Sequence, residues 1–104
     1  MPHFVRLVRL TEAGAKNTKN FKKMVDSSKK IFASNGVRLV DAYATFGKYD
    51  VVAIVEAPNE AAMARVGAAV AAQGYFSVQT MAAMKLDAFT RTVSSRAPAK
   101  KKRR

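Results

Sequence analysis

The chain of 104 residues contains no cysteine, and His3 is its only histidine. Without cysteine there is no disulfide framework, no thiolate nucleophile and no cysteine-ligated zinc. A single histidine argues against multi-histidine metal sites and against a Ser–His–Asp triad built elsewhere in the chain. We therefore predict no metal site, no cofactor and no catalytic residue, and the residues favour a protein that is not an enzyme.

Long apolar runs are also absent, because none approaches the ~18 residues that a membrane span requires. The start, Met1-Pro2-His3-Phe4, lacks a charged segment followed by an apolar stretch, so we expect no signal peptide. Membrane insertion is not expected, and a soluble cytoplasmic protein follows by default. The length suits one domain with a modest core.

Acidic residues are scarce, with seven Asp or Glu against 19 Lys or Arg. The imbalance is concentrated near the end, because residues 91–104 hold seven bases and no acid, whereas residues 1–90 carry a net charge of +5. Beyond Val93 no periodicity survives, and the apolar surface is too small to offset the entropy of ordering. We therefore predict a folded domain over residues 1–92 and a disordered basic tail over residues 93–104.

The segment 37–57 determines the expected fold class. Its two halves show period-two alternation with β-branched or aromatic residues, which is typical of strands. Gly47 and Asp50 favour a tight reversal between them, because glycine tolerates a positive φ and aspartate can bond local backbone. Both faces of this hairpin are apolar along much of their length. A sheet face in water would be polar at every second position, so both faces should be covered.

Further strands are predicted over residues 3–10 and 75–86, with helices from about 17 to 34 and over 60–73. The first helix has a loose start, capped by Thr11. The β-α-β-β-α-β order is the split pattern of α+β ferredoxin-like folds, with both helices on one face of a four-stranded antiparallel sheet. Two copies packed sheet against sheet would cover the other face. We therefore expect a homodimer or higher homo-oligomer of the dimeric α+β barrel type.

Several separate motifs, in the expected order, resemble those of the GYD-domain family. The matching segments are Met1-Pro2, Leu10-Thr11-x-x-Gly14, Gly47-x-Tyr49-Asp50-Val51-Val52, Val55-Glu56-Ala57-Pro58-Asn59 and Lys85-Leu86-Asp87-Ala88-Phe89-Thr90. The resemblance covers about residues 1–90 and implies a small, bacterial protein similar in fold to dimeric α+β barrels. Most members of such families have no assigned activity. The basic tail departs from the family pattern, since many relatives end soon after the Phe-Thr pair.

Tyr49 and Asp50 are the first candidate site residues. A phenol beside a carboxylate could orient a small ligand or transfer a proton. The structural interpretation, which we favour, is that Asp50 bonds turn amides while Tyr49 packs over the sheet edge. His3 and Tyr43 complete the set of ligand-pocket candidates. Arginines that could place positive charge near them are Arg6, Arg9 and Arg38.

A cavity between the sheet and the alanine-rich helix 60–73 is a second possibility, since such spaces are usual ligand sites. The side chains that would line it are Met63, Phe76, Met81, Met84 and Phe89. Core packing is the favoured role for these side chains, because methionine fills irregular gaps. The corresponding hypothesis is a small-molecule binder or cofactor-free enzyme, and it depends on fold analogy alone.

Basic side chains form the third group. The candidates are Lys22, Lys23, Lys29 and Lys30 on the first helix, and Arg96, Lys100, Lys101, Lys102, Arg103 and Arg104 in the tail. A basic tail of this kind neutralises phosphates and releases counterions. It lacks aromatic residues for base stacking, so its binding to nucleic acid would be non-specific. An anionic membrane surface and a merely solubilising tail are alternatives. The leading hypothesis is a small oligomeric binding protein whose tail contacts nucleic acid or another polyanion.

Overall fold

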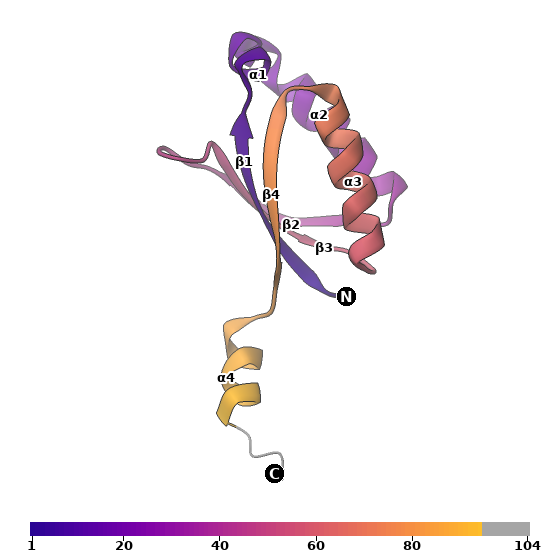
Figure 1. The fold of residues 1–104 in the computed structure, drawn as a ribbon, viewed down its shortest axis with the longest axis vertical. Helices are drawn as coiled ribbons and strands as arrows, with labels where there is room; N and C mark the ends of the chain where they lie inside the picture. The colour runs from indigo at the N-terminus through magenta and orange to yellow at the C-terminus, as the bar shows by residue number, and fades with distance from the viewer. Residues whose placement is uncertain (95–104) are drawn as a thin grey trace.

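The computed structural model describes residues 1–94. In chain order its elements are β1 (His3–Leu10), α1 (Glu12–Lys16), the 3-10 helix η1 (Thr18–Asn20), α2 (Phe21–Ser34), β2 (Arg38–Ala44), β3 (Val51–Glu56), α3 (Glu60–Gln73), β4 (Phe76–Ala83) and α4 (Leu86–Ser94). The strands form one antiparallel sheet in the order β2-β3-β1-β4, and α2 and α3 cover one of its faces (Figure 1). This is the ferredoxin-like arrangement, so the predicted α+β fold class is confirmed.

The first helical region has the loose start that the sequence predicts, but its long helix begins at Phe21 and not at about residue 17. The Thr11 hydroxyl accepts a hydrogen bond from the Gly14 amide over 3.1 Å and caps α1, and η1 separates this short helix from α2. The Thr11 hydroxyl also donates to the Gly74 carbonyl over 2.6 Å, while the Thr11 amide donates to the Tyr75 carbonyl over 3.0 Å. The motif around Thr11 and Gly14 therefore fastens the end of β1 to the turn between α3 and β4.

Helix α3 has the bounds that the sequence predicts. The Asn59 side chain accepts a hydrogen bond from the Ala62 amide over 2.9 Å and satisfies one of the free donors at the helix start. Gly74 ends the helix with φ of 82°, a left-handed conformation that glycine adopts without a steric penalty. The alanine-rich surface of α3 lets it lie close to the sheet.

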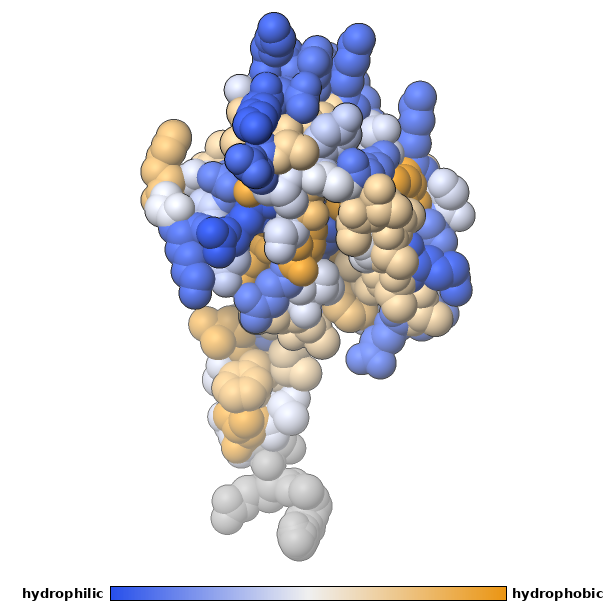
Figure 2. Space-filling view, turned by 45° about the horizontal axis from the view of Figure 1, so that its top comes forward, coloured by the Kyte–Doolittle hydropathy of each residue, from blue (hydrophilic) through white to orange (hydrophobic). Residues whose placement is uncertain are grey.

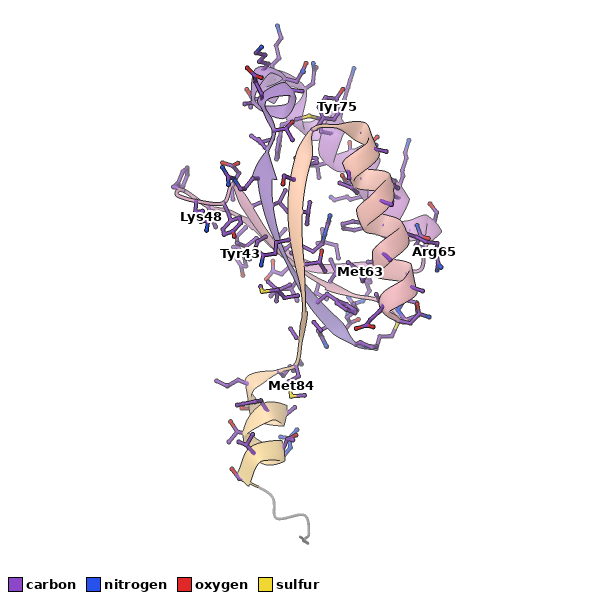
Figure 3. All side chains as sticks on the ribbon, in the orientation of Figure 1. Tyr43, Lys48, Met63, Arg65, Tyr75 and Met84 are labelled. Carbon is purple, nitrogen blue, oxygen red and sulfur yellow. The ribbon has the colours of Figure 1, made fainter. Side chains whose placement is uncertain are left out.

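The hydrophobic core lies between the sheet and the two long helices. Its main members are Phe4 and Val8 of β1, Val55 of β3, Phe76 of β4, Met24 and Phe32 of α2, and Met63, Val66 and Val70 of α3. Met63 lies between α3 and the sheet (Figure 3). The alternating buried positions of β1 and β3 set which side of each strand faces the helices.

The last strand ends earlier than predicted, and a further helix follows it. Strand β4 ends at Ala83 because its partner there is His3, the first residue of β1, and no strand remains to pair with Met84. The prediction of a strand to Leu86 was therefore wrong. Helix α4 projects away from the rest of the domain, and Met84 lies at the junction (Figures 1 and 3). Of the predicted tail, residues 93 and 94 form the end of α4, and the remainder lies outside the described residues.

The other face of the sheet, called the open face below, is not covered by any element within residues 1–94. Apolar side chains on strands β1, β3 and β4 of this face are Val5, Leu7, Val52, Ile54 and Met81, all partly or largely exposed. Strand pairing aligns Val5 with both Ile54 and Met81, so these three form one row across the sheet. The expectation that a second copy covers this surface remains a prediction.

Candidate functional site

The segment from Gly47 to Asp50 connects β2 to β3 and is held by strand β1. The Asp50 carboxylate Oδ2 accepts a hydrogen bond from the Leu10 amide over 2.8 Å, and the Asp50 amide donates to the Val8 carbonyl over 2.8 Å. The side chain therefore anchors the connection to the end of β1, whereas the sequence suggested bonds to amides of the turn itself. Gly47 has φ of 144°, which explains glycine at this position.

Tyr49 extends from this connection to β4. Its hydroxyl contacts Gln79 Oε1 over 3.1 Å, and the Lys48 ammonium lies 5.7 Å from the centre of its ring. Gln79 pairs with Leu7 of β1, so the phenol reaches past β1 at one end of the open face. Figure 3 shows Lys48 beside this connection. Tyr49 and Asp50 are thus joined to different strands and do not form one acid–base pair.

His3 and Tyr43 lie elsewhere on the open face. His3 Nε2 lies 3.2 Å from Glu56 Oε2, and Arg38 Nη2 lies 2.7 Å from Glu56 Oε1. The hydrogen bond from Arg38 lowers the pKa of Glu56 below its usual range. The Tyr43 hydroxyl donates to Asp41 Oδ2 over 2.8 Å, which raises the pKa of this exposed phenol. Each group already has its own partner.

The four ligand-pocket candidates therefore bond to different partners and do not converge on one point. His3 belongs to the row that contains Glu56 and Arg38, whereas Tyr43 belongs to the row of Val52. The hypothesis of a small-molecule site or cofactor-free enzyme needs these polar groups to converge. Because these groups are separated, this face offers, among the described residues, no set of polar side chains that could act together on one small molecule.

Exposed apolar side chains form the largest feature that the sequence analysis missed. Leu86, Phe89 and Val93 of α4 are 76%, 49% and 62% exposed and recur at the three- and four-residue spacing of one helix face. Figure 2 shows the hydrophobic side chains of α4 at the bottom of the view. Phe46, in the connection between β2 and β3, is fully exposed. The three- and four-residue spacing of Leu86, Phe89 and Val93 was the signal in the sequence that could have revealed this apolar helix face.

A cavity of about 80 Å³ lies between α2 and the sheet. Among the side chains predicted to line such a space only Phe76 does so, because Met63 is in the core and the other predicted side chains are exposed. Arg6 also lines it and is only 4% exposed. In the sequence, Arg6 shares the period-two positions of Phe4 and Val8, and this pattern was the signal that it faces the core. The signal is easily missed because an arginine side chain is usually solvated.

The lysine candidates lie as expected on the exposed side of α2. All four are exposed, and Lys22 forms an ion pair with Asp26 over 2.9 Å. The hydrogen bond to this carboxylate raises the pKa of Lys22. The tail candidates lie outside the described residues, namely Arg96, Lys100, Lys101, Lys102, Arg103 and Arg104. Within residues 1–94, no helix has the length and apolar content needed to cross a membrane.

The element order, the strand order and the uncovered sheet face define a ferredoxin-like α+β domain. A solved structure supports this fold: the chain is similar to the C-terminal domain of the MgtC protein from Mycobacterium tuberculosis, with a TM-score of 0.52 and 16% identity. The similarity covers 79% of this chain and 86% of that domain. At this level of identity the similarity concerns the fold alone.

The family model of the GYD domain matches residues 4–93. The chain therefore belongs to the GYD-domain family, which confirms the resemblance seen in the sequence motifs. A relative from Thermus thermophilus is 39% identical over 82 residues, which cover 78% of this chain and 84% of the relative. That relative is named glutamine synthetase and cystathionine beta-lyase binding protein.

Proposed function

We propose that this chain is a non-catalytic, cytoplasmic protein-binding module whose partner docks on α4. The observation that carries the proposal is the apolar side of α4, formed by Leu86, Phe89 and Val93, which contributes no buried residue to the domain. Exposed apolar clusters of this kind mark interaction sites. A Thermus relative named as a binding protein supports the same class of function.

Helix α4 has the properties of a docking helix. It spans nine residues, and an isolated helix of this length is marginal in water, so a partner would stabilise it. Side chains at three- and four-residue spacing are the anchors by which a helix enters a hydrophobic groove. Asp87 in the first turn and Arg91 in the last complement the helix dipole and support the same helical register.

The open face has a different role in this proposal, namely contact with a second copy of the chain. Its central row of Val5, Ile54 and Met81 is apolar, as a sheet-on-sheet interface requires. A homodimer would present two α4 helices together and raise avidity for an oligomeric partner through effective concentration. We propose metabolic enzymes as partners, of the kind named for the Thermus relative, namely glutamine synthetase and cystathionine beta-lyase.

The test is binding to purified glutamine synthetase from the organism that encodes this chain, immobilised on a biosensor. The variant L86S/F89S removes the apolar anchors, and Arg91→Gln alters the opposite side of the same helix as a matched control. We expect L86S/F89S to weaken binding by about 10-fold or more and Arg91→Gln to leave it within about threefold. Equal binding by the wild type and L86S/F89S would exclude α4 as the docking element.

Polyanion binding by the basic segments is the second proposal. The exposed lysines of α2 support it, together with the seven bases of residues 91–104. Deletion of residues 95–104 preserves α4 and removes six of these bases. Gel shifts with duplex DNA at two salt concentrations measure the effect, because each phosphate contact adds a slope of about −0.9 to the salt dependence. Unchanged retention of DNA by the truncated chain would eliminate a role for the tail.

A further inference from the structure

Arg6 is a buried cation without a counter-ion among the described residues. Its side chain extends from the central strand β1 towards α2, where the guanidinium carbon lies 4.9 Å from the centre of the Phe32 ring. Its Nε and Nη2 atoms are buried and have no hydrogen-bond partner within residues 1–94, and no carboxylate in that range forms an ion pair with it. Burial lowers the pKa of Arg6 to about 10.

This arrangement is costly unless something else satisfies the guanidinium. A buried unpaired charge loses its hydration without gaining a partner, and unsatisfied donors carry a further penalty. The contact with Phe32 offsets only part of this cost, since a ring face accepts no directed hydrogen bond. A second copy on the open face would not help, because Arg6 is on the helix side of the sheet.

The cavity supplies the space for the missing partner. Its volume of about 80 Å³ exceeds the roughly 10–15 Å³ that one water needs on the same measure. Apolar side chains make up most of its lining, among them Val8, Phe32 and Phe76, and Lys29 places a second cation there. The site therefore combines an apolar pocket with one deeply placed hydrogen-bonding group, which is the usual composition of a small-ligand site.

We propose that this cavity, called the Arg6 pocket, binds a small apolar monocarboxylate whose carboxylate pairs with the guanidinium of Arg6. The two unsatisfied atoms, Nε and Nη2, form one edge of the guanidinium, and this edge matches the two oxygens of a carboxylate. The apolar lining would receive a short hydrocarbon chain or a single ring. A tetrahedral dianion fits less well, because most of the lining is apolar and only Ser28 and Lys29 add donors to those of Arg6.

The experiment uses the full chain with hexanoate and benzoate as probes, and hexanamide and benzamide as neutral probes of similar shape. Titration calorimetry gives affinities, and thermal unfolding gives the stabilisation. We expect the carboxylates to raise Tm by about 4–8 °C at about five times their Kd. The amides should bind at least about 10-fold more weakly, because they lack the charge that pairs with Arg6.

Two variants assign the site. Arg6→Met keeps an apolar side chain of similar length, and it should raise Tm without ligand and abolish carboxylate binding, because the unpaired charge is gone. Arg9→Met is the matched control, since Arg9 is an exposed residue of the same strand on the other face. It should bind the carboxylates as the wild type does.

A direct readout keeps the proposal testable even where Arg6→Met fails to fold. The Nε–H resonance of Arg6 in a proton–nitrogen NMR spectrum of the wild type should move on addition of hexanoate and stay in place with hexanamide. Equal responses to acid and amide, or equal binding by Arg6→Met and the wild type, would overturn the proposal. Saturable binding of inorganic phosphate at Arg6 in place of the carboxylates would overturn the assigned ligand class.

Discussion

The backbone amide of Leu10 donates a hydrogen bond of 2.8 Å to the carboxylate of Asp50, a residue 40 positions later in the chain. This bond joins the end of the central strand β1 to the connection between β2 and β3. The neighbouring bond from the Asp50 amide to the Val8 carbonyl strengthens the same junction. The aspartate of the family motif therefore has a structural role that can be measured.

Asp50→Ala should destabilise the domain by about 1.5–3 kcal/mol, because it removes a charge-assisted acceptor and leaves the Leu10 amide unpaired. Asp50→Asn keeps an acceptor oxygen and should lose about half as much. Urea unfolding at neutral pH gives both values. If Asp50→Ala were as stable as the wild type, the bond would contribute nothing to folding and the motif residue would need another explanation.

Gly14→Ala should destabilise the chain by about 1–3 kcal/mol. A Cβ atom at this position would collide with the Tyr75 carbonyl oxygen, and this backbone atom is held by its bond from Thr11. Gly67→Ala in α3 is the matched control, since a Cβ there meets no atom within 4 Å. It should stabilise by about 0.4–1 kcal/mol by restricting the unfolded chain. Thermal unfolding of the two variants should show shifts of opposite sign.

The pH dependence of stability should contain a contribution from Glu56. The hydrogen bond from Arg38 lowers its pKa in the folded state, so its stabilising contribution is present above the unfolded value of about 4.3. This contribution is lost as the pH falls from there through the folded pKa. Glu56→Gln and Arg38→Gln should both flatten the acidic part of the curve of Tm against pH. Carbon NMR titration of the Glu56 carboxyl checks the pKa directly, and an ordinary value would refute the assignment.

Ile54→Glu should convert the predicted homodimer to a monomer. The substitution places a charge on the open face at the end of the apolar row, next to Val5, where a sheet-on-sheet contact would bury it without a partner. We expect the dimer dissociation constant to rise by about 100-fold or more. Ala64→Glu, on the exposed side of α3, should leave assembly unchanged. Sedimentation velocity measures both variants, and a monomeric wild type would contradict the prediction.

Elements whose signals are local were predictable from the sequence. The alternation of residues 3–10 and the cap at Asn59 depend only on neighbouring residues, and the structure has the expected strand and helix at these places. The bounds of α3 follow from a capping side chain at one end and Gly74 at the other. The fold class then follows from the order of the elements.

Features set by pairing between distant segments were not predictable in the same way. The end of β4 at Ala83 depends on where β1 begins. A register shift between Leu39 and Asp41 turns the two residues to opposite faces of β2, although simple alternation places them together. The partner of the Asp50 carboxylate and the burial of Arg6 likewise depend on which strands become neighbours.

The placement of α4 after the last strand has an evolutionary consequence. Only Met84 and Lys85 join it to β4, and none of its side chains is buried in the domain. Substitutions in this helix therefore disturb no packing of the core, whereas the strands and the two long helices are constrained by packing. A chain built in this way can acquire new binding preferences by altering the nine residues of this helix while its scaffold stays the same.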